Sequence, residues 1–306
     1  MNVLAFDFNN ILTDVIEELT RRGHTILPLD GKASTWKKAD VVIVWNETEG
    51  GGWRDWIKKV QKAGKRVILI QHGRRGTSRI YPPFNDELVS DVVCVWGEND
   101  VKRLTSCGVP REKIFVTGTP VTHTTKPRKT HAGKNVVFSP EHWDTDVMEN
   151  AIVAGALRRI PDVKIITKIL ENEHRPHEYD NPIASNRLQP GHLDVCAEVL
   201  SIADAVVSIS EGTFELLAQS LGIPVIIADI WVPKACLGDE RHKLYQREYS
   251  NACERVKDLY KLGDVVKKHL KNPDLLKRER EEICILDGGT NIENPVEEII
   301  KVIEYE

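Results

Sequence analysis

The chain has 306 residues, 41% of them hydrophobic and 29% charged, with a formal net charge of −4. This is the balance of an ordinary globular protein, long enough for one large domain or for two of about 150 residues. The acidic total excludes a chain that is basic overall, so binding to nucleic acid would need a local basic patch. No apolar run approaches the ~20 residues that a membrane-spanning helix needs.

The first part of the chain alternates short apolar runs with amphipathic segments. Apolar runs without polar alternation are typical of strands covered on both faces, and so of a parallel sheet between helices. Strands are predicted at residues 3–6, 41–45, 67–70, 92–96 and 114–116. Helices are predicted at 11–22, ending at Gly23, and from Trp53 to Gly64, with Trp56, Ile57 and Val60 on one face.

Residues 117–134 interrupt this rhythm, because they have no apolar periodicity and contain several helix and strand breakers. They indicate an interdomain linker, and a long surface loop inside one domain is the alternative. The alternation then restarts, with strands predicted at 136–138, 163–166, 205–209 and 225–227 and helices at 145–159, 194–202 and 213–221. The charged tail from Glu254 onward is predicted to be helical, with Gly288 and Gly289 ending one helix and Pro295 near the start of the last, 296–303.

This repetition predicts an α/β fold of two Rossmann-like, doubly wound domains that face a central cleft. The expected parts are an N-terminal domain (1–122), a linker (123–134), a C-terminal domain (135–288) and a C-terminal helix (289–306). We expect that last helix to pack back on the N-terminal domain.

The cysteines and the N-terminus point to a cytoplasmic protein. The six cysteines are scattered without a C-x-x-C pair, and several lie in apolar runs, as Cys94 does. Met1 leads directly into a strand pattern, so no signal peptide is expected. His192 and Cys196 share one predicted helix face, but no second ligand pair is near them in the sequence, so no metal site is expected.

The most informative stretch connects the predicted strand 205–209 to the helix that begins at Thr213. Ligands of parallel sheets bind beyond the carboxyl ends of the strands, and the first turn of a helix offers N–H groups to an anion. Gly212 would let the backbone approach a diphosphate closely, and Ser210 and Thr213 would add hydroxyl donors. Glu211 and Glu215 are expected to contact the donor as well. The alternative is a simple helix cap, with Glu215 exposed on the first turn of the helix.

Residues 210–215, Ser-Glu-Gly-Thr-Phe-Glu, together with Gly222-Ile223-Pro224, resemble the sugar-nucleotide motif of GT-B glycosyltransferases and UDP-N-acetylglucosamine 2-epimerases. Residues 96–100, followed by the Gly-Val-Pro-Arg-Glu-Lys-Ile-Phe-Val-Thr-Gly-Thr-Pro passage at 108–120, resemble the end of the N-terminal domain in the same superfamily. The two stretches flank the linker in the expected order, so the resemblance covers most of the chain. It implies a GT-B-like fold, with the acceptor on the N-terminal domain and a nucleotide-sugar on the C-terminal one.

The acid on the motif helix departs from the family pattern. Relatives place a ribose-binding Glu five residues before the Gly of Gly-x-Pro, and that position here is Leu217. Glu215 lies seven residues before Gly222 and stays the candidate for that role. In the same domain, Ser139 and Lys168 follow predicted strands, and Lys168 could neutralise charge on a leaving diphosphate. The alternative for Lys168 is an ordinary surface lysine.

Candidate catalysts follow the predicted strands of the N-terminal domain. His72 follows strand 67–70 in a Gln-His-Gly-Arg-Arg-Gly stretch, where a neutral imidazole could take a proton from an acceptor hydroxyl. A His-Gly here also resembles polysaccharide-building relatives. Asp7 is the second candidate base, and Glu47 and Glu98 are further acids at strand ends. The expected contacts to the acceptor or to phosphate are Gly73, Arg74, Arg75 and Arg79 from the same stretch, together with Glu98.

The resemblance and these residues predict a glycosyltransferase that uses a nucleotide-sugar, most simply a UDP-sugar, with no further cofactor. The acceptor would be a hydroxyl on modified DNA, on a polysaccharide or on a lipid-linked sugar. DNA is a candidate acceptor because two stretches, residues 74–79 and residues 126–129 (Lys-Pro-Arg-Lys), are basic in an acidic chain. A sugar-nucleotide 2-epimerase and a non-catalytic nucleotide-sugar binding protein are the alternatives.

Overall fold

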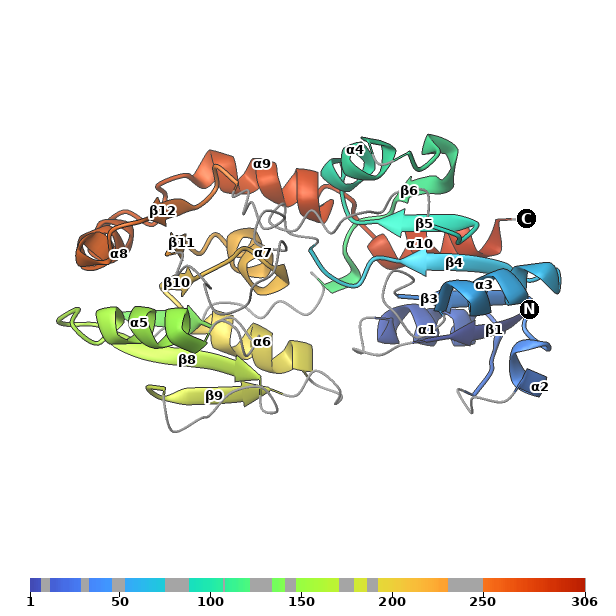
Figure 1. Cartoon of the computed structure of the whole chain (residues 1–306), viewed down its shortest axis with the longest axis horizontal. Helices are drawn as coiled ribbons and strands as arrows, with labels where there is room; N and C mark the ends of the chain where they lie inside the picture. Colours follow the sequence, from blue (N-terminus) through green and yellow to red (C-terminus); the bar gives the residue numbers. More distant parts are fainter. Residues whose placement is uncertain are drawn as a thin grey trace, which may run out of the picture. The chain divides into compact units, whose positions relative to one another are not determined.

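A computed structural model describes residues 1–6, 12–28, 33–45, 53–74, 88–106, 108–121, 134–140, 147–170, 179–185, 192–230 and 250–305. They form two compact units (Figure 1): unit 1 contains the described residues up to 121 together with 285–305, and unit 2 those from 134 to 284. Residues 122–133 of the predicted linker lie outside the described residues. The domain boundaries given above therefore stay a prediction.

Unit 1 is built on a parallel sheet in the order β2-β1-β3-β4-β5-β6. Its strands are β1 (Asn2–Ala5), β2 (Thr25–Ile26), β3 (Val41–Val44), β4 (Arg66–Ile70), β5 (Val92–Val95) and β6 (Ile114–Val116). The five predicted strands are confirmed. Strand β2 was not predicted, because two paired residues leave no recognisable period.

Helices cover both faces of this sheet, as the two-sided apolar runs predict (Figure 1). They are α1 (Thr13–Arg21), α2 (Ala33–Trp36), α3 (Trp53–Lys62), α4 (Glu98–Ser106) and α10 (Pro295–Glu304). Residues Val3, Ile43 and Ile68 pack on one face with α1 and α10, where Ile299 and Ile303 of α10 are fully buried. The alternate strand residues pack on the other face with α2, α3 and α4. The last helix of the chain is therefore part of the core of unit 1.

Unit 2 repeats the scheme with a parallel sheet in the order β12-β11-β10-β7-β8-β9. Its strands are β7 (Asn135–Ser139), β8 (Lys164–Leu170), β9 (Pro182–Ser185), β10 (Ala205–Ser208), β11 (Val225–Ala228) and β12 (Glu254–Val256). Its helices are α5 (Val147–Leu157), α6 (His192–Ser201), α7 (Thr213–Ser220), α8 (Leu262–Lys271) and α9 (Lys277–Gly288), of which α9 runs across the boundary between the units.

The start of the C-terminal tail differs from the prediction. Glu254 begins a strand, β12, which pairs in parallel with β11, and the helices α8 and α9 come only after it. Charged residues are common on a strand at the edge of a sheet, so Glu254 and Arg255 hid this strand in the sequence. Within the described residues, no helix is both long and apolar enough to cross a membrane.

Each sheet has one point at which the direction of chain winding reverses. In unit 2 the chain proceeds from β7 outward to β8 and β9, and then returns to the other side of β7 to form β10. In unit 1 the same reversal lies between β1 and β3. Open α/β sheets bind ligands beyond the carboxyl ends of the strands at such a point. The predicted fold class of two doubly wound, Rossmann-like halves is confirmed.

Candidate functional site

The connection from β10 to α7 has the predicted strand–turn–helix geometry. Gly212 is the N-cap residue with an extended backbone, and α7 begins at Thr213. The helix ends at Ser220 and is followed by Gly222, whose φ of +75° is a left-handed conformation that glycine adopts without strain. The N–H of Ile223 then donates to the Ala218 carbonyl at 2.9 Å, and the chain enters β11. The positive end of α7 thus lies directly after the carboxyl end of β10.

Glu215 is buried at the start of α7 and caps its own helix. Its Oε2 accepts a hydrogen bond from the Gly212 N–H at 2.7 Å, and only 4% of the residue is exposed. Burial raises the pKa of the Glu215 carboxyl, and hydrogen bonds from two backbone N–H groups and from Ser208 and Ser139 act in the opposite direction. Leu217, at the position where the resemblance implies a ribose-binding acid, lies in the core with 5% exposed.

Three polar side chains lie at or near the ends of the central strands beside this helix. Ser139 ends β7 and is in register with Ser208, which ends β10, and the Ser208 hydroxyl donates to the Ser139 carbonyl at 3.1 Å. Lys168 follows Thr167, which is in register with Phe138, so the lysine reaches the same level of the sheet. The sequence predicted that Lys168 follows the end of its strand. In the structure β8 continues to Leu170, so Lys168 lies within the strand.

The same cluster includes two residues from the neighbouring helices. The ammonium nitrogen of Lys168 lies 5.6 Å from the centroid of the Phe214 ring on the first turn of α7. Cys196 of α6 is buried, which raises the pKa of its thiol, while the charge of Lys168 acts to lower it. Strands β7, β8 and β10 and helices α6 and α7 therefore bring hydroxyls, a cation and N–H groups together at the winding reversal of unit 2.

Glu215 is not the exposed residue that the helix-cap alternative assumes. Glu211, in the turn before α7, is buried as well. Only 3% of the residue is exposed, and its Oε1 accepts hydrogen bonds from the N–H and the hydroxyl of Ser250, at 3.0 and 2.9 Å. The two acids of the motif thus hold the turn and the first turn of α7 in place. Ser210 and Thr213 are half-buried beside them.

In unit 1, His72 follows β4 and is anchored to the end of β3. Its Nδ1 lies 2.9 Å from the backbone carbonyl of Trp45, and the two rings meet edge to face with centroids 4.7 Å apart. A carbonyl oxygen only accepts, so this contact requires the proton on Nδ1 and leaves the lone pair on Nε2. The imidazole is half-buried.

The residues on either side of His72 are buried and hydrogen-bonded. The Gln71 side chain donates to the Asp100 carboxylate at 2.8 Å and to the Gly73 carbonyl at 2.9 Å, and it accepts from the Trp96 N–H at 2.9 Å. Arg74, on the other side, pairs with Asp287. Segment 71–74 is thus held at both ends, with His72 and Gly73 between the anchors.

Two of the remaining predicted residues of unit 1, Glu98 and Arg74, are among the described residues. Glu98 is the exposed first residue of α4, and Arg74 is buried against Asp287. Asp7, Glu47, Arg75 and Arg79 lie outside the described residues. Sequence reasoning missed Ser208, Phe214, Trp45 and Gln71. Ser208 and Trp45 were placed in strands, and their terminal position was the signal that could have identified them.

No group of three or more His, Cys, Asp or Glu side chains in the described part of the chain is arranged to hold a metal ion.

Comparison with known proteins gives matches in structure and none in sequence. No protein-family model and no curated protein matches the sequence. The structure is similar to UDP-GlcNAc 2-epimerase from Neisseria meningitidis bound to UDP-GlcNAc, with a TM-score of 0.62 and 13% identity over 100% of both chains. It is similar to the wall teichoic acid polymerase TagF, with a TM-score of 0.59 and 12% identity over 98% of this chain and 87% of TagF. It also resembles Anabaena Alr3699/HepE in complex with UDP-glucose, with a TM-score of 0.57 and 10% identity over 99% of this chain and 100% of the other.

At this level of identity the likeness establishes the fold. The chain has the two-unit, Rossmann-like architecture of the GT-B fold, and the resemblance predicted from the motif residues is confirmed at that level.

Proposed function

We propose that this protein is a glycosyltransferase that transfers a sugar from a nucleotide diphosphate donor to a hydroxyl acceptor. The observation that carries the proposal is the cluster at the winding reversal of unit 2, where Ser139, Ser208 and Lys168 lie beside the N-terminus of α7. Hydroxyls, a lysine and helix N–H groups together suit a diphosphate better than an uncharged ligand. Three structural neighbours contain UDP or a UDP-sugar, which supports a UDP-sugar as the donor.

The donor diphosphate would bind at the first turn of α7. Gly212 lets the backbone approach the ligand, Thr213 supplies a hydroxyl and an N–H, and Ser210 supplies a second hydroxyl. Lys168 would stabilise the negative charge that builds up on the leaving diphosphate, and the helix dipole acts in the same sense. These groups supply the charge stabilisation themselves, so we propose that the donor is the only small molecule required besides the acceptor.

His72 is the proposed general base. Its Nδ1–H is hydrogen-bonded to the Trp45 carbonyl. Nε2 would then accept the proton of the acceptor hydroxyl as that oxygen attacks the anomeric carbon. The carbon–oxygen bond to the leaving diphosphate breaks in the same reaction, and the diphosphate keeps the electron pair. Asp7 stays the second candidate for this role, and Glu98 a candidate for acceptor contact.

The nearest alternative is a sugar-nucleotide 2-epimerase, which needs several carboxylates and a histidine around the sugar ring. Both acids of the motif, Glu211 and Glu215, are buried and hydrogen-bonded to their own unit, which argues against such a role. A binding protein without catalysis is the alternative from another class. The orientation of His72 favours an enzyme over that alternative.

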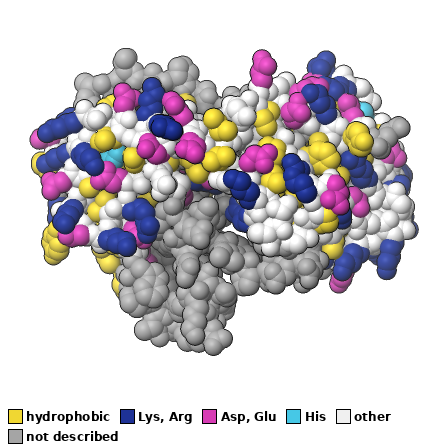
Figure 2. Space-filling model, turned by 90° about the horizontal axis from the view of Figure 1, so that it is seen from above, with side chains coloured by type: hydrophobic (Ala, Val, Ile, Leu, Met, Phe, Trp, Pro, Cys, Tyr) yellow, Lys and Arg dark blue, Asp and Glu magenta, His cyan; other side chains and the backbone are white. Residues whose placement is uncertain are grey.

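The acceptor remains a choice between modified DNA and a polysaccharide or lipid-linked sugar. Arg74 was expected to contact phosphate, but its guanidinium pairs with Asp287 and the side chain is only 2% exposed. On the face that Figure 2 shows, Lys and Arg side chains are interspersed with Asp and Glu side chains over the described residues. The pairing of Arg74 favours a carbohydrate acceptor over a DNA backbone. The other basic residues of the DNA hypothesis, Arg75, Arg79 and residues 126–129, lie outside the described residues. Affinity for duplex DNA that falls steeply with salt would reverse that preference.

A donor screen with the whole chain tests the proposal. The protein is mixed with UDP-sugars, with and without candidate acceptors, and free UDP and the sugar product are measured. Free UDP that appears only with an acceptor supports a transferase, an epimerised sugar supports the epimerase, and binding without turnover supports the binding protein. The Lys168→Met variant should lose donor affinity, and the His72→Ala variant should bind donor normally but transfer about 10²–10⁴-fold more slowly.

A further inference from the structure

The last turn of helix α9 contacts the segment that contains His72, residues 71–74, through a pair of charged side chains. Arg74 closes segment 71–74, and its guanidinium meets the carboxylate of Asp287, a residue in the last turn of α9, some 213 positions further along the chain. Nε donates to Oδ2 at 2.8 Å, and Nη2 lies 2.7 Å from the same oxygen. Both side chains are almost fully buried, with 2% and 7% exposed.

The other oxygen of the Asp287 carboxylate is also bonded. Oδ1 accepts a hydrogen bond at 2.7 Å from the side-chain amide of Asn99, on the first turn of α4. A buried carboxylate with charge-assisted hydrogen bonds on both oxygens has one orientation, because any rotation would break a bond in a poorly solvated place. Asp287 therefore fixes Arg74 in one position.

The backbone at Asp287 is fixed as well. A Cβ atom on Gly97 would lie 2.1 Å from the Leu286 carbonyl oxygen, and a Cβ atom on Gly289 would lie 2.2 Å from the Trp96 carbonyl oxygen. The Thr119 N–H donates to the Gly288 carbonyl at 3.0 Å. The end of α9 thus lies in direct backbone contact with the ends of β5 and β6, and it carries Asp287 to Arg74 without freedom to shift.

We propose that Asp287 is a positioning residue for His72, acting through Arg74. Gln71 anchors one side of segment 71–74 from β5 and α4, and Asp287 anchors the other side from α9. The two anchors together hold the histidine at the distance from the Trp45 carbonyl that keeps the proton on Nδ1. This inference rests on the proposed role of His72 as the base, but it concerns how the imidazole is held, which can be measured without a substrate.

The Asp287→Asn variant tests the proposal, with Glu304→Gln as the matched control. Asp287 and Glu304 both link the C-terminal segment of unit 1 to the N-terminal part of that unit through an arginine, Arg74 and Arg22 respectively. Of the two, only Asp287 reaches segment 71–74. The ¹⁵N NMR signals of the imidazoles, assigned with His72→Ala, report the tautomer. We expect the Nδ1–H form of His72 in the parent protein and in Glu304→Gln, and a mixture of tautomers in Asp287→Asn.

Kinetics provide the second measurement once a donor and an acceptor are known. Asp287→Asn should lower kcat about 10–100-fold and change the KM for the donor less than about twofold, because a shift of the base by about 1 Å weakens catalysis and not donor binding. Arg74→Lys should give an intermediate loss, since a lysine keeps the charge but not the two-pronged geometry.

The outcomes separate the positioning role from a purely structural one. If Asp287→Asn lowers the thermal stability as Glu304→Gln does and leaves the His72 tautomer and kcat unchanged, the proposal is wrong. If Asp287→Asn does not fold, Asn99→Ala removes one hydrogen bond from the same carboxylate and must shift the tautomer in the same direction, or the proposal is again wrong. A shifted tautomer in a protein without transferase activity would overturn the proposed function and leave this inference standing.

Discussion

Glu215 combines two properties that oppose each other at neutral pH. As a carboxylate it accepts the hydrogen bond that caps α7 and so stabilises the start of the helix. Burial disfavours the charged carboxylate, and its hydrogen-bond partners are hydroxyls and backbone N–H groups. It also lies at the end of α7 that we propose for the diphosphate, where a second negative charge would repel the ligand. The balance of these effects depends on whether the carboxyl carries a proton.

The Glu215→Gln variant should therefore change how stability depends on pH. Burial raises the pKa of this carboxyl in the folded protein above the ordinary value of 4.5, so the folded state binds more protons than the unfolded state in the pH range just above 4.5. The parent protein should lose stability relative to the variant as the pH rises through that range, and the difference should stop changing below it. Urea unfolding of both proteins at several pH values measures this, and a constant difference across the range would show that the carboxyl is not perturbed.

His72 shows what a single sequence can say about a residue of this kind. Its place after a buried strand identified it as a candidate, because parallel strands direct their carboxyl ends to one edge. Its tautomer could not be predicted, since that depends on the carbonyl of Trp45, which comes from another strand. The same holds for Arg74: its sequence neighbours suggested phosphate, and its distant partner Asp287 became visible only in three dimensions.

At the scale of elements, the described glycines with the least space for a side chain are Gly97 and Gly289, which lie against the end of α9 and just after it. Gly289 has a φ of +59°, and an added Cβ would lie 2.2 Å from one backbone atom and 2.8 Å from another. Gly64, which ends α3, has a similar φ of +73° but nothing within 4 Å of an added Cβ. A comparison of alanine variants at Gly64 and Gly289 therefore separates the cost of a left-handed backbone from the cost of insufficient space for a Cβ atom.

Gly64→Ala should cost about 1–2 kcal/mol, the strain of a left-handed alanine alone. Gly289→Ala should cost about 1–3 kcal/mol more, because the backbone of Trp96 and of Gly118 must also move. Equilibrium unfolding in urea measures both variants. Equal losses would mean that the end of α9 is not packed against β5 and β6 as closely as the structure has it.

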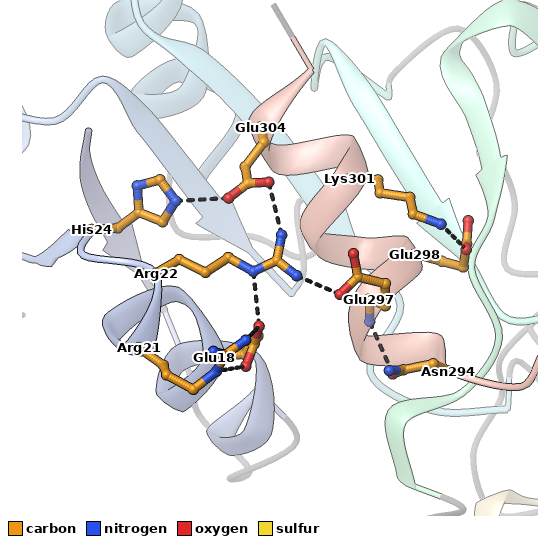
Figure 3. Close-up of polar contacts among 9 residues, drawn as sticks. All are labelled: Glu18, Arg21, Arg22, His24, Asn294, Glu297, Glu298, Lys301 and Glu304. Atoms are coloured by element: carbon orange, nitrogen blue, oxygen red, sulfur yellow. Dashed lines mark hydrogen bonds and ion pairs between the residues drawn. The ribbon is translucent and has the colours of Figure 1, made fainter.

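Helices α1 and α10 are held together by a cluster of charges around Arg22 (Figure 3). Arg22 contacts Glu18 on α1 and both Glu297 and Glu304 on α10, and His24 lies 2.9 Å from Glu304. The bonds to Arg21 and Arg22 lower the pKa of Glu18 to about 2. Arg21, by contrast, contacts only Glu18 of its own helix among the acids drawn, and is largely exposed.

Arg22→Gln should lower the melting temperature more than Arg21→Gln, because only Arg22 connects the two helices. The difference should shrink as salt is added, since exposed charges are screened beyond about 10 Å at 0.1 M ionic strength. Thermal unfolding of both variants at low and high salt checks this. A difference that persists at high salt would assign the loss to packing of the arginine stem instead of its charge.

The sequence predicted most elements because their apolar runs are long and uniform, and it failed where local sequence carries little weight. β2 and β12 are short strands on sheet edges, and Glu254 at the start of β12 is charged, so their strand identity depends on the neighbour with which they pair. The sequence predicted that Lys168 lies near the carboxyl end of its strand. It did not predict β9, which pairs with residues 167–170 of β8 and so extends that strand past Lys168.

For the whole molecule, the two units have separate cores, and the last helix of the chain belongs to the core of the first. The proposed donor site is built from unit 2 alone: Ser139, Lys168, Ser208 and the start of α7 all lie between residues 134 and 284. A donor that binds there stabilises the folded form of unit 2, because the unfolded chain does not assemble the site.

UDP should therefore raise the stability of unit 2 by about 2.7 kcal/mol at a concentration near 100 times its dissociation constant. Hydrogen exchange followed by mass spectrometry assigns that gain to peptides. Peptides of β7, β10 and α7 should become more protected, while β1 and β3 of unit 1 should change little, because acceptor and donor are proposed to bind different units. Lys168→Met is the control, since it should fold normally and need a higher UDP concentration for the same protection. Protection confined to unit 1, or identical curves for the parent and Lys168→Met, would move the nucleotide away from α7 and would remove the basis for a transferase.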